Sequence, residues 1–120
     1  MSPIGQIEVD QRGSVLVAEI SGEVDLSNVG EMERVIALSV GRDTHDVVLD
    51  LTPTMFIDST GVRMIFELAR RLRVRRHRLR LVAGEETLVH RVIAMTQLHE
   101  VVPVDASLDA AFVALESEAE

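Results

Sequence analysis

The chain has 120 residues, 47% of them hydrophobic, and a formal net charge of −8. This length suits one hydrophobic core, so we expect a single domain over residues 1–120, with an ordered core from about residue 6 to 115 and an acidic tail over 116–120. The absence of cysteine excludes disulfides and thiolate metal sites. No signal peptide is evident, and no apolar run approaches the roughly 20 residues that span a bilayer. We therefore expect a cytoplasmic protein without membrane insertion.

The first part of the chain predicts a hairpin and a helix. Residues 6–10 and 15–23 form two predicted strands around a glycine turn, because Val15, Val17 and Glu19 alternate in face with Leu16, Ala18 and Ile20. The outer edge of this hairpin could pair with another copy and form a homodimer. Apolar residues at helical spacing then predict a helix over residues 28–40, with Ser27 or Asn28 as its N-cap.

Strands and helices alternate through the rest of the chain. The predicted strands are 47–51, 79–82 and 101–104, and the predicted helices are 60–75, 85–96 and 107–115. In the third helix, we expect Leu88, Val92, Ile93 and Met95 to be buried. This alternation indicates the α/β class, with a mostly parallel central sheet of about five strands and about four helices.

A serine stands at the junction between the strand 47–51 and the helix 60–75. Asp58, Ser59 and Thr60 open this helix, which places Ser59 at or beside the N-cap. A serine there commonly caps the helix by accepting a hydrogen bond from a backbone N–H, which contributes about 1 kcal/mol. The free N–H groups and partial positive charge of a helix N-terminus also suit a phosphate. Capping and modification are therefore both open roles for Ser59.

Three segments together carry a family resemblance: residues 21–27 (Ser-Gly-Glu-Val-Asp-Leu-Ser), the strand 47–51 with the Phe-Ile-Asp-Ser-Thr-Gly run over 56–61, and residues 98–111. They resemble the STAS domain family, in particular the bacterial anti-sigma factor antagonists, over nearly the whole chain. The resemblance implies a protein that binds an anti-sigma factor with serine kinase activity and frees a sigma factor. It also implies inactivation when that partner phosphorylates Ser59, and a phosphatase that restores the hydroxyl.

The resemblance assigns the phosphorylation site to Ser59. The residues that we expect to contact the partner are Asp25, Ser27, Asp58, Thr60, Gly61 and Arg63. From the residues alone, Asp25 could equally order the turn before the first helix. One departure from the family is Gln97, where many members have a glycine after the third helix. The alternative function is a STAS interaction module of a lipid transporter or of a stress-signalling scaffold.

Other chemistry is not favoured. Ser59 lacks the Gly-x-Ser-x-Gly setting of a hydrolase nucleophile, and no histidine partner for it is evident. The glycines are scattered and form no phosphate-binding loop, and the four histidines show no metal-ligand spacing. We therefore expect no catalytic residue, no metal and no cofactor, and a protein that is not an enzyme.

The basic residues are concentrated in one segment. All twelve are arginines, and seven lie at the end of the second predicted helix and in the turn after it: Arg70, Arg71, Arg73, Arg75, Arg76, Arg78 and Arg80. Cations in a last helical turn complement the helix dipole, and long arginines form a solvated face. Direct nucleic-acid binding is disfavoured because Tyr and Trp are absent and the remaining chain is acidic. An acidic patch on a protein partner is the better-matched target.

Overall fold

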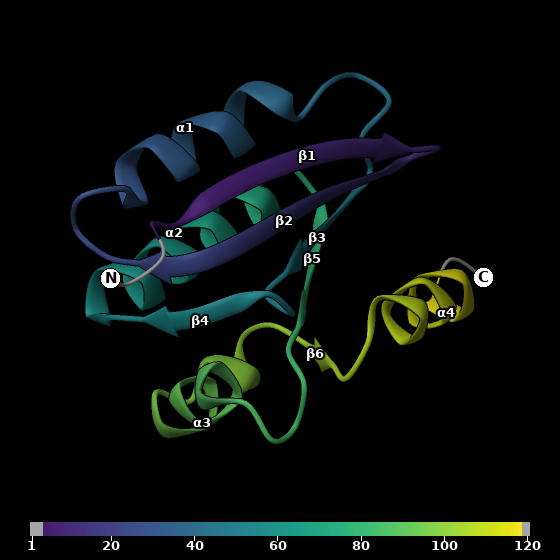
Figure 1. Cartoon of the computed structure of the whole chain (residues 1–120). Coiled ribbons are helices and arrows are strands. Elements are labelled where there is room, and N and C mark those ends of the chain that lie inside the picture. Colours follow the sequence, from purple (N-terminus) through teal and green to yellow (C-terminus); the bar gives the residue numbers. More distant parts are fainter. Residues whose placement is uncertain (1–3, 119–120) are drawn as a thin grey trace.

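The strands of this protein form one six-stranded sheet, which the computed structural model describes over residues 4–118 (Figure 1). The elements in chain order are β1 (Gln6–Arg12), β2 (Val15–Val24), α1 (Val29–Ser39), β3 (Asp46–Asp50), β4 (Thr54–Ile57), α2 (Ser59–Val74), β5 (Arg78–Val82), α3 (Leu88–Met95), the short 3₁₀ helix η1 (Leu98–Glu100), β6 (Val104–Asp105) and α4 (Leu108–Glu118). β1 is antiparallel to β2, and the other pairings between these strands are parallel. The predicted class, sheet and four α-helices are therefore confirmed.

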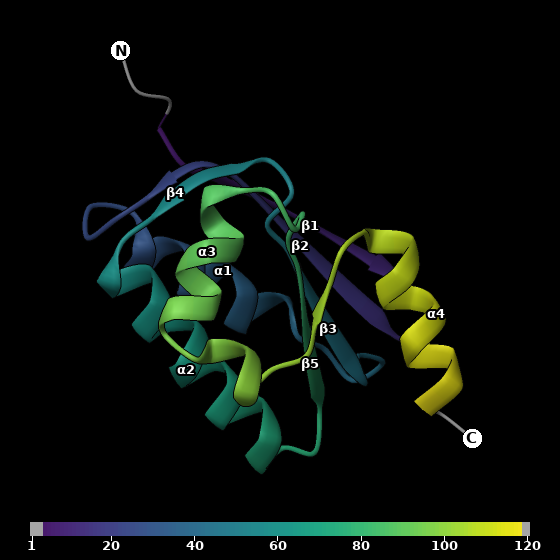
Figure 2. The ribbon, with the colours of Figure 1, turned by 90° about the horizontal axis from the view of Figure 1, so that it is seen from below.

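Helices cover the two faces of the sheet unequally (Figure 2). α1, α2 and α3 gather on one face, and α4 lies alone on the other. Because both faces are covered, β2 carries a continuous apolar run instead of a simple alternation. Leu16, Ala18 and Ile20 pack in the larger cluster on the first face, whereas Val15 and Val17 pack with residues of α4. The sheet therefore separates a large core from a small one.

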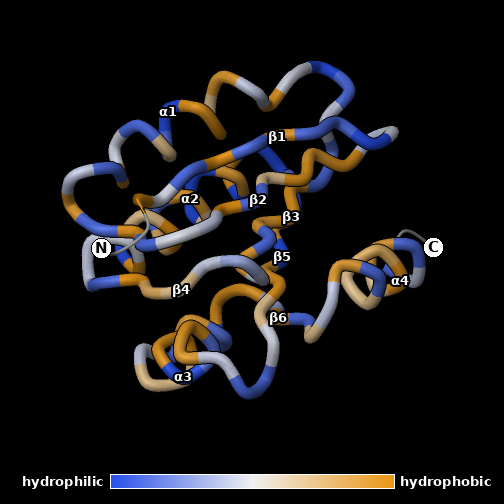
Figure 3. The backbone as a smooth tube through the Cα atoms, viewed as in Figure 1, coloured by the Kyte–Doolittle hydropathy of each residue, from blue (hydrophilic) through white to orange (hydrophobic). Residues whose placement is uncertain are grey.

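β1 is an edge strand along which hydrophilic and hydrophobic residues alternate (Figure 3). Ile7 packs against the larger core, whereas Glu8 and Asp10 are exposed. Within residues 4–118, β1 pairs with β2 alone, and the homodimer through this edge stays a prediction. None of the helices in the same range is long and apolar enough to cross a membrane.

β2 is long enough to pair with two strands in succession. Its first half, Val15–Glu19, pairs with β3, and Gly22–Val24 pair with β4, with a shift of register between Gly22 and Glu23. Gly22 has a φ of +76°, and a Cβ at this position would lie 2.7 Å from the carbonyl oxygen of Ile4. Glycine is therefore required here for both conformation and space. The shift to β4 brings the ends of β2 and β4 together.

β4 was not predicted, because no strand was expected between the strand 47–51 and the helix 60–75. The Pro53 carbonyl accepts a hydrogen bond from the Gly22 N–H at 3.1 Å, and the Thr54 hydroxyl donates to the Ile20 carbonyl at 2.6 Å. These long-range bonds fix a strand of only four residues. Local pattern cannot reveal such a strand, since its pairing with the distant β2 is irregular and leaves Met55 of β4 without a partner in the register.

The third helical segment is shorter than predicted, and of the four side chains expected to be buried Ile93 is buried and Val92 half-buried. α3 begins after Thr87, whose hydroxyl oxygen caps the helix by accepting from the His90 N–H at 3.2 Å. Val89 and Ile93 are buried, whereas Leu88 and Met95 are 49% and 82% exposed. The expectation that Leu88 and Met95 are buried was therefore wrong, because adjacent apolar residues left the helix face ambiguous.

The last part of the chain also differs from its prediction. The expected strand 101–104 is reduced to the two residues of β6, because η1 and the turn after it occupy residues 98–102. Gln97 takes the left-handed conformation, with a φ of +61°, which glycine adopts more readily than other residues. Residues 116–118, expected in an acidic tail, continue α4, and residues 119–120 lie outside the described range.

Two arginines of β5 form ion pairs on the α4 side of the sheet. Arg78 makes a bidentate pair with Asp46, at 2.6 and 3.0 Å, and Arg80 makes one with Asp105, at 2.7 and 3.1 Å. Glu118 of α4 lies near both guanidinium groups, 2.9 Å from Arg80 and 3.4 Å from Arg78. These contacts tie the last turn of α4 to β5.

The Arg80–Asp105 pair predicts a stability difference between two substitutions. Arg80→Ala should lower the free energy of unfolding by about 2–4 kcal/mol, because the Asp105 side chain, 11% exposed, loses its cation. Glu118→Ala should lower it by less than about 1 kcal/mol, because the Glu118 side chain is 48% exposed. Urea unfolding at neutral pH measures both. Equal losses for the two variants would contradict the account of a buried pair.

Candidate functional site

Asp58 and the first turn of α2 form the centre of the candidate site. Asp58 is the N-cap, with extended backbone, and its Oδ1 atom accepts from the N–H groups of Thr60 at 2.9 Å and Gly61 at 3.1 Å. The Thr60 hydroxyl donates to the same oxygen. Ser59 is therefore the first residue of the helix and not its cap, so the capping interpretation of Ser59 was wrong.

The Ser59 side chain is left available by this arrangement. Ser59 is exposed, and its hydroxyl makes no hydrogen bond with any residue between 4 and 118. Thr60, the neighbouring hydroxyl, is half-buried and already donates to Asp58. Of these two hydroxyl groups at the start of α2, Ser59 alone is both exposed and unbonded to the described chain. It is the group that an incoming reagent can reach.

Hydrogen bonds hold the Asp58 carboxylate in its charged form. Burial by itself would raise the pKa of Asp58, but the side-chain bond from Thr60 and the backbone bonds from Gly61, Thr60 and Leu26 together lower this pKa below its ordinary value. A carboxylate with a lowered pKa is a weak base. Asp58 is therefore suited to cap α2 and poorly suited to take a proton from Ser59.

This lowered pKa predicts a pH dependence of stability. Because the folded-state pKa lies below 3.8, the ordinary Asp value, the stabilisation is fully present above that pH and is lost as the pH falls through the folded pKa. We expect Asp58→Asn, which still caps, to be less stable than the wild type at pH 7. The difference should shrink as the pH falls from about 5 to 2. Urea midpoints of both proteins measure this, and a difference that stays constant with pH would contradict it.

The loop between β2 and α1 lies beside the start of α2. Asp25 Oδ1 accepts from the Ser27 N–H at 2.9 Å and from the Ser27 hydroxyl, so this carboxylate orders its own loop. Asn28 is the N-cap residue of α1, but its side chain bonds the Asp25 N–H and the Glu23 carbonyl instead of the helix. The turn-forming role of Asp25 is therefore present in the structure.

The loop between β2 and α1 and the junction between β4 and α2 are joined directly. The Asp58 N–H donates to the Val24 carbonyl at 3.2 Å, and Val24 pairs with Ile57 at the ends of β2 and β4. Asp25 and Asp58 each follow directly after one of these paired residues. The structure thus brings two predicted contact segments, residues 25–27 and 58–60, to one edge of the sheet.

One local motif recurs three times and was missed in the sequence. In the Asp-x-Ser/Thr runs 25–27, 50–52 and 58–60, the aspartate Oδ1 accepts both the N–H and the hydroxyl of the residue two positions later. Each run stands at or just after the end of a strand, where Asp commonly forms such turns. The spacing of Asp and Ser or Thr was the available signal. Over residues 4–118, no group of His, Asp or Glu is arranged to hold a metal ion.

The other two predicted contact residues differ in accessibility. Arg63 is exposed one turn after Ser59, and both line a groove of about 410 Å³ with Thr60, Val62, Phe66 and Glu67. Gly61 is buried, and a Cβ there would meet the side chains of Ile57 and Val24. Gly61 therefore has a packing role that the sequence did not reveal.

Exposed apolar side chains surround this edge of the sheet. Leu26 is 76% exposed on the loop before α1, and Met55 and Phe56 of β4 are 57% and 40% exposed. Apolar side chains grouped near an exposed polar site are typical of surfaces that contact other proteins. The site therefore combines a reachable hydroxyl, a groove and an apolar border.

Known proteins resemble this chain in sequence and fold. The chain is 31% identical over 68 residues to BtrV of Bordetella bronchiseptica, which is provisionally assigned as an anti-sigma factor antagonist; the match covers 57% of this chain and 59% of BtrV. The crystal structure of an anti-sigma factor antagonist from Mycobacterium paratuberculosis has a TM-score of 0.84 and 25% identity, over 94% of this chain and 95% of that chain.

The anti-sigma factor antagonist SpoIIAA shares the fold at lower identity. Its unphosphorylated form has a TM-score of 0.76 and 18% identity, over 93% of this chain and 97% of that chain. SpoIIAA from Bacillus has also been solved in a phosphorylated form. The model of the STAS domain family matches residues 6–111 of the present sequence. This chain therefore belongs to the STAS domain family.

Proposed function

We propose that this protein is an anti-sigma factor antagonist. It binds an anti-sigma factor that has serine kinase activity, frees the sigma factor, and is inactivated when the kinase phosphorylates Ser59. The observation that carries the proposal is the exposed, unbonded Ser59 hydroxyl at the first position of α2, where Asp58 already caps the helix. The anti-sigma factor antagonists among its relatives, one of which has a phosphorylated form, support this assignment.

In the transfer step, the Ser59 oxygen attacks the γ-phosphorus of ATP bound to the kinase. A new O–P bond forms, the bond from the γ-phosphorus to the β–γ bridging oxygen breaks, and ADP leaves. The hydroxyl proton passes to a base on the kinase, because Asp58 has a lowered pKa and its Oδ1 atom is occupied by Thr60 and Gly61. This protein supplies only the acceptor.

The phosphate would change the contact surface without disrupting the domain. It adds about −1.5 to −2 charge beside Asp58 and close to the loop of Asp25, at a surface that previously carried a small neutral hydroxyl. The N-terminus of α2 stabilises negative charge at this position, so folding should be unaffected. Repulsion and bulk then weaken binding to the anti-sigma factor, and a phosphatase would reverse the change.

A competition experiment tests this function. The purified protein is added to a complex of a sigma factor and a candidate anti-sigma kinase from the same genome, with a non-hydrolysable ATP analogue to prevent phosphorylation. We expect this protein to displace the sigma factor and form a complex with the kinase. Stable binding to a transporter subunit or a scaffold, with no displacement of sigma factor from the candidate kinases, would contradict the proposal and favour the alternative STAS functions.

A further inference from the structure

A second surface, remote in the chain from Ser59, lies along the open edge of β5. Over its whole length, Arg78–Val82, β5 pairs with β3 on one side. On its other side, β6 reaches only Leu81 and Val82, so residues 78–80 have no neighbouring strand within the described chain. An open strand edge presents backbone donors and acceptors to any extended segment that reaches it.

The backbone of Leu79 faces this open side. The N–H groups of Leu81 and Ala83 donate away from β3, to the carbonyls of Pro103 at 2.9 Å and Asp105 at 3.0 Å. Hydrogen-bonding groups alternate in direction along a strand, so Leu79 directs its N–H and C=O to the same side as Leu81. These are the two groups that an added strand would bond.

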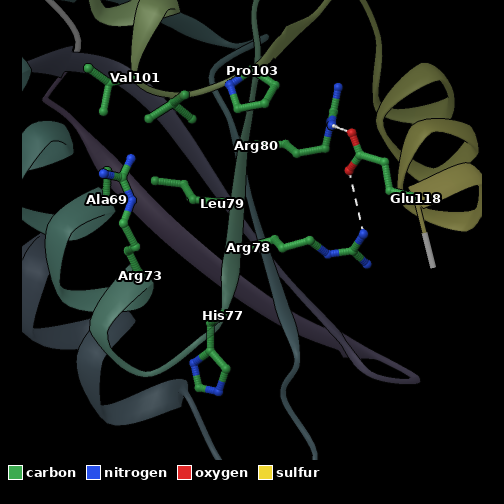
Figure 4. A pocket seen from close by; sticks show the side chains of 10 residues that line it. Ala69, Arg73, His77, Arg78, Leu79, Arg80, Val101, Pro103 and Glu118 are labelled. Atoms are coloured by element: carbon green, nitrogen blue, oxygen red, sulfur yellow. Dashed lines mark hydrogen bonds and ion pairs between the residues drawn. The ribbon is translucent and has the colours of Figure 1, made fainter.

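A groove of about 280 Å³ lies along this edge (Figure 4). Ala69 and Arg73 of α2, Leu79 of β5, and Val101 and Pro103 of the segment before β6 contribute to its lining. Figure 4 shows the Arg73 side chain beside Ala69, on the side of β5 to which Leu79 points. The lining therefore offers an apolar contact and one cation on the same side of the edge.

The charges on the two sides of β5 are different. Arg78 and Arg80 point toward Glu118 in Figure 4, and their charges are met by Asp46, Asp105 and Glu118. In contrast, Arg73, Arg75 and Arg76 form no ion pair with residues 4–118. Of these three, Arg73 lines the groove, so the α2 side of the groove carries a positive charge that no carboxylate among residues 4–118 matches.

We propose that this groove binds an extended acidic segment of another protein, which adds to the sheet as a strand beside β5. Its backbone bonds Leu79, and one apolar side chain packs over Leu79 beside Ala69 and Val101. Because side chains alternate along a strand, the residue two positions away lies on the same side and places a carboxylate at Arg73. The intervening residue points toward Glu118 and should not be acidic. This inference is independent of the function proposed for Ser59.

Selection from a random peptide-display library on the purified protein tests the proposal. We expect enrichment of peptides in which an acidic residue stands two positions from an apolar one. Arg73→Glu should lower the affinity for the most tightly bound peptide at least tenfold, whereas Arg34→Glu should leave this affinity unchanged. Arg34 is a matched control because it is an exposed helical arginine that does not line the groove. Thermal unfolding verifies that both variants fold.

Nuclear magnetic resonance then locates the bound peptide. The Leu79 amide proton should shift and exchange more slowly with solvent, while amides around Ser59 stay unchanged. The proposal is overturned if no peptide is enriched, if the enriched peptides are not acidic, or if they perturb the Ser59 region instead. It is also overturned if the protein self-associates in sedimentation experiments and Arg73→Glu abolishes this, because a second copy would then occupy the groove.

Discussion

Ser59→Asp should weaken binding to the anti-sigma factor by about tenfold or more, which corresponds to at least about 1.4 kcal/mol. The substitution puts a fixed negative charge where the partner meets a neutral hydroxyl, beside Asp58 and on an exposed surface. A carboxylate at the first helical position complements the dipole of α2, so the melting temperature should stay the same or rise slightly. Calorimetric titration measures the affinity, and thermal unfolding excludes a loss of structure.

Two matched variants separate charge from size in this experiment. Ser59→Asn introduces a side chain of nearly the same size as Ser59→Asp does, but without charge. It should therefore lose less affinity for the anti-sigma factor than Ser59→Asp. Ser59→Ala removes the hydroxyl without adding bulk, and it should retain binding while preventing phosphorylation. If Ser59→Asp kept full affinity, or if Ser59→Asn lost as much, electrostatic repulsion would not be the mechanism of the switch.

Gly61→Ala should lower the free energy of unfolding by about 1–3 kcal/mol. A Cβ on Gly61 would approach the Ile57 side chain closely and lie 3.0 Å from Cγ1 of Val24. Ile57 and Val24 are 3% and 0% exposed, so neither has room to move without disturbing the ends of β2 and β4. This steric cost exceeds the gain of up to about 1 kcal/mol that alanine normally brings to a helix.

Gly30→Ala provides the control for this substitution. Gly30 lies near the start of α1, as Gly61 lies near the start of α2, but a Cβ there would have no neighbour within 4 Å. Gly30→Ala should therefore raise the free energy of unfolding by up to about 1 kcal/mol. Chemical unfolding of both variants tests the comparison. A stabilising effect at both positions would show that the close packing at Gly61 can relax.

The sequence predicted those parts of the fold that have a strong local signal. One face of α2 repeats apolar residues at helical spacing: Val62, Ile65, Ala69 and Leu72 on this face are buried, and Phe66 is half-buried. β4 has only four residues and depends on an irregular pairing with the distant strand β2, so no local pattern predicts it. In α3, neighbouring apolar residues allow more than one buried face, and only packing against the sheet selects Val89.

For the candidate site, the sequence predicted local structure but not the detail of the hydrogen bonds. The polar run 58–60 does lie at the start of a helix, and the loop of Asp25 does lie beside it. The sequence did not predict that Asp58 rather than Ser59 caps α2, because Ser and Asp are almost equally good N-caps. The burial of Gly61 depends on Val24, which is 37 positions earlier in the sequence. Long-range packing of this kind carries no local signal.

The arginine segment divides into two chemically different parts. Arg78 and Arg80 belong to the sheet and are matched by carboxylates on the α4 side. Arg70 and Arg71 pair with glutamates of α2 and α1, whereas Arg73, Arg75 and Arg76 have no such partner within residues 4–118. Spacing alone could not separate these roles, because the residues are nearly contiguous in sequence. The two groups of arginines are separated because α2 ends at Val74 and β5 begins at Arg78, so the chain turns between them.

Phosphate mapping on this protein would test the central claim most directly. The wild type and Ser59→Ala are each incubated with ATP and the anti-sigma kinase that binds them, and intact mass analysis with peptide mapping follows. The account predicts one phosphoryl group on the wild type, located at Ser59, and none on Ser59→Ala. Phosphate at Thr60 or elsewhere, or stable kinase binding with no phosphate on the wild type, would contradict it.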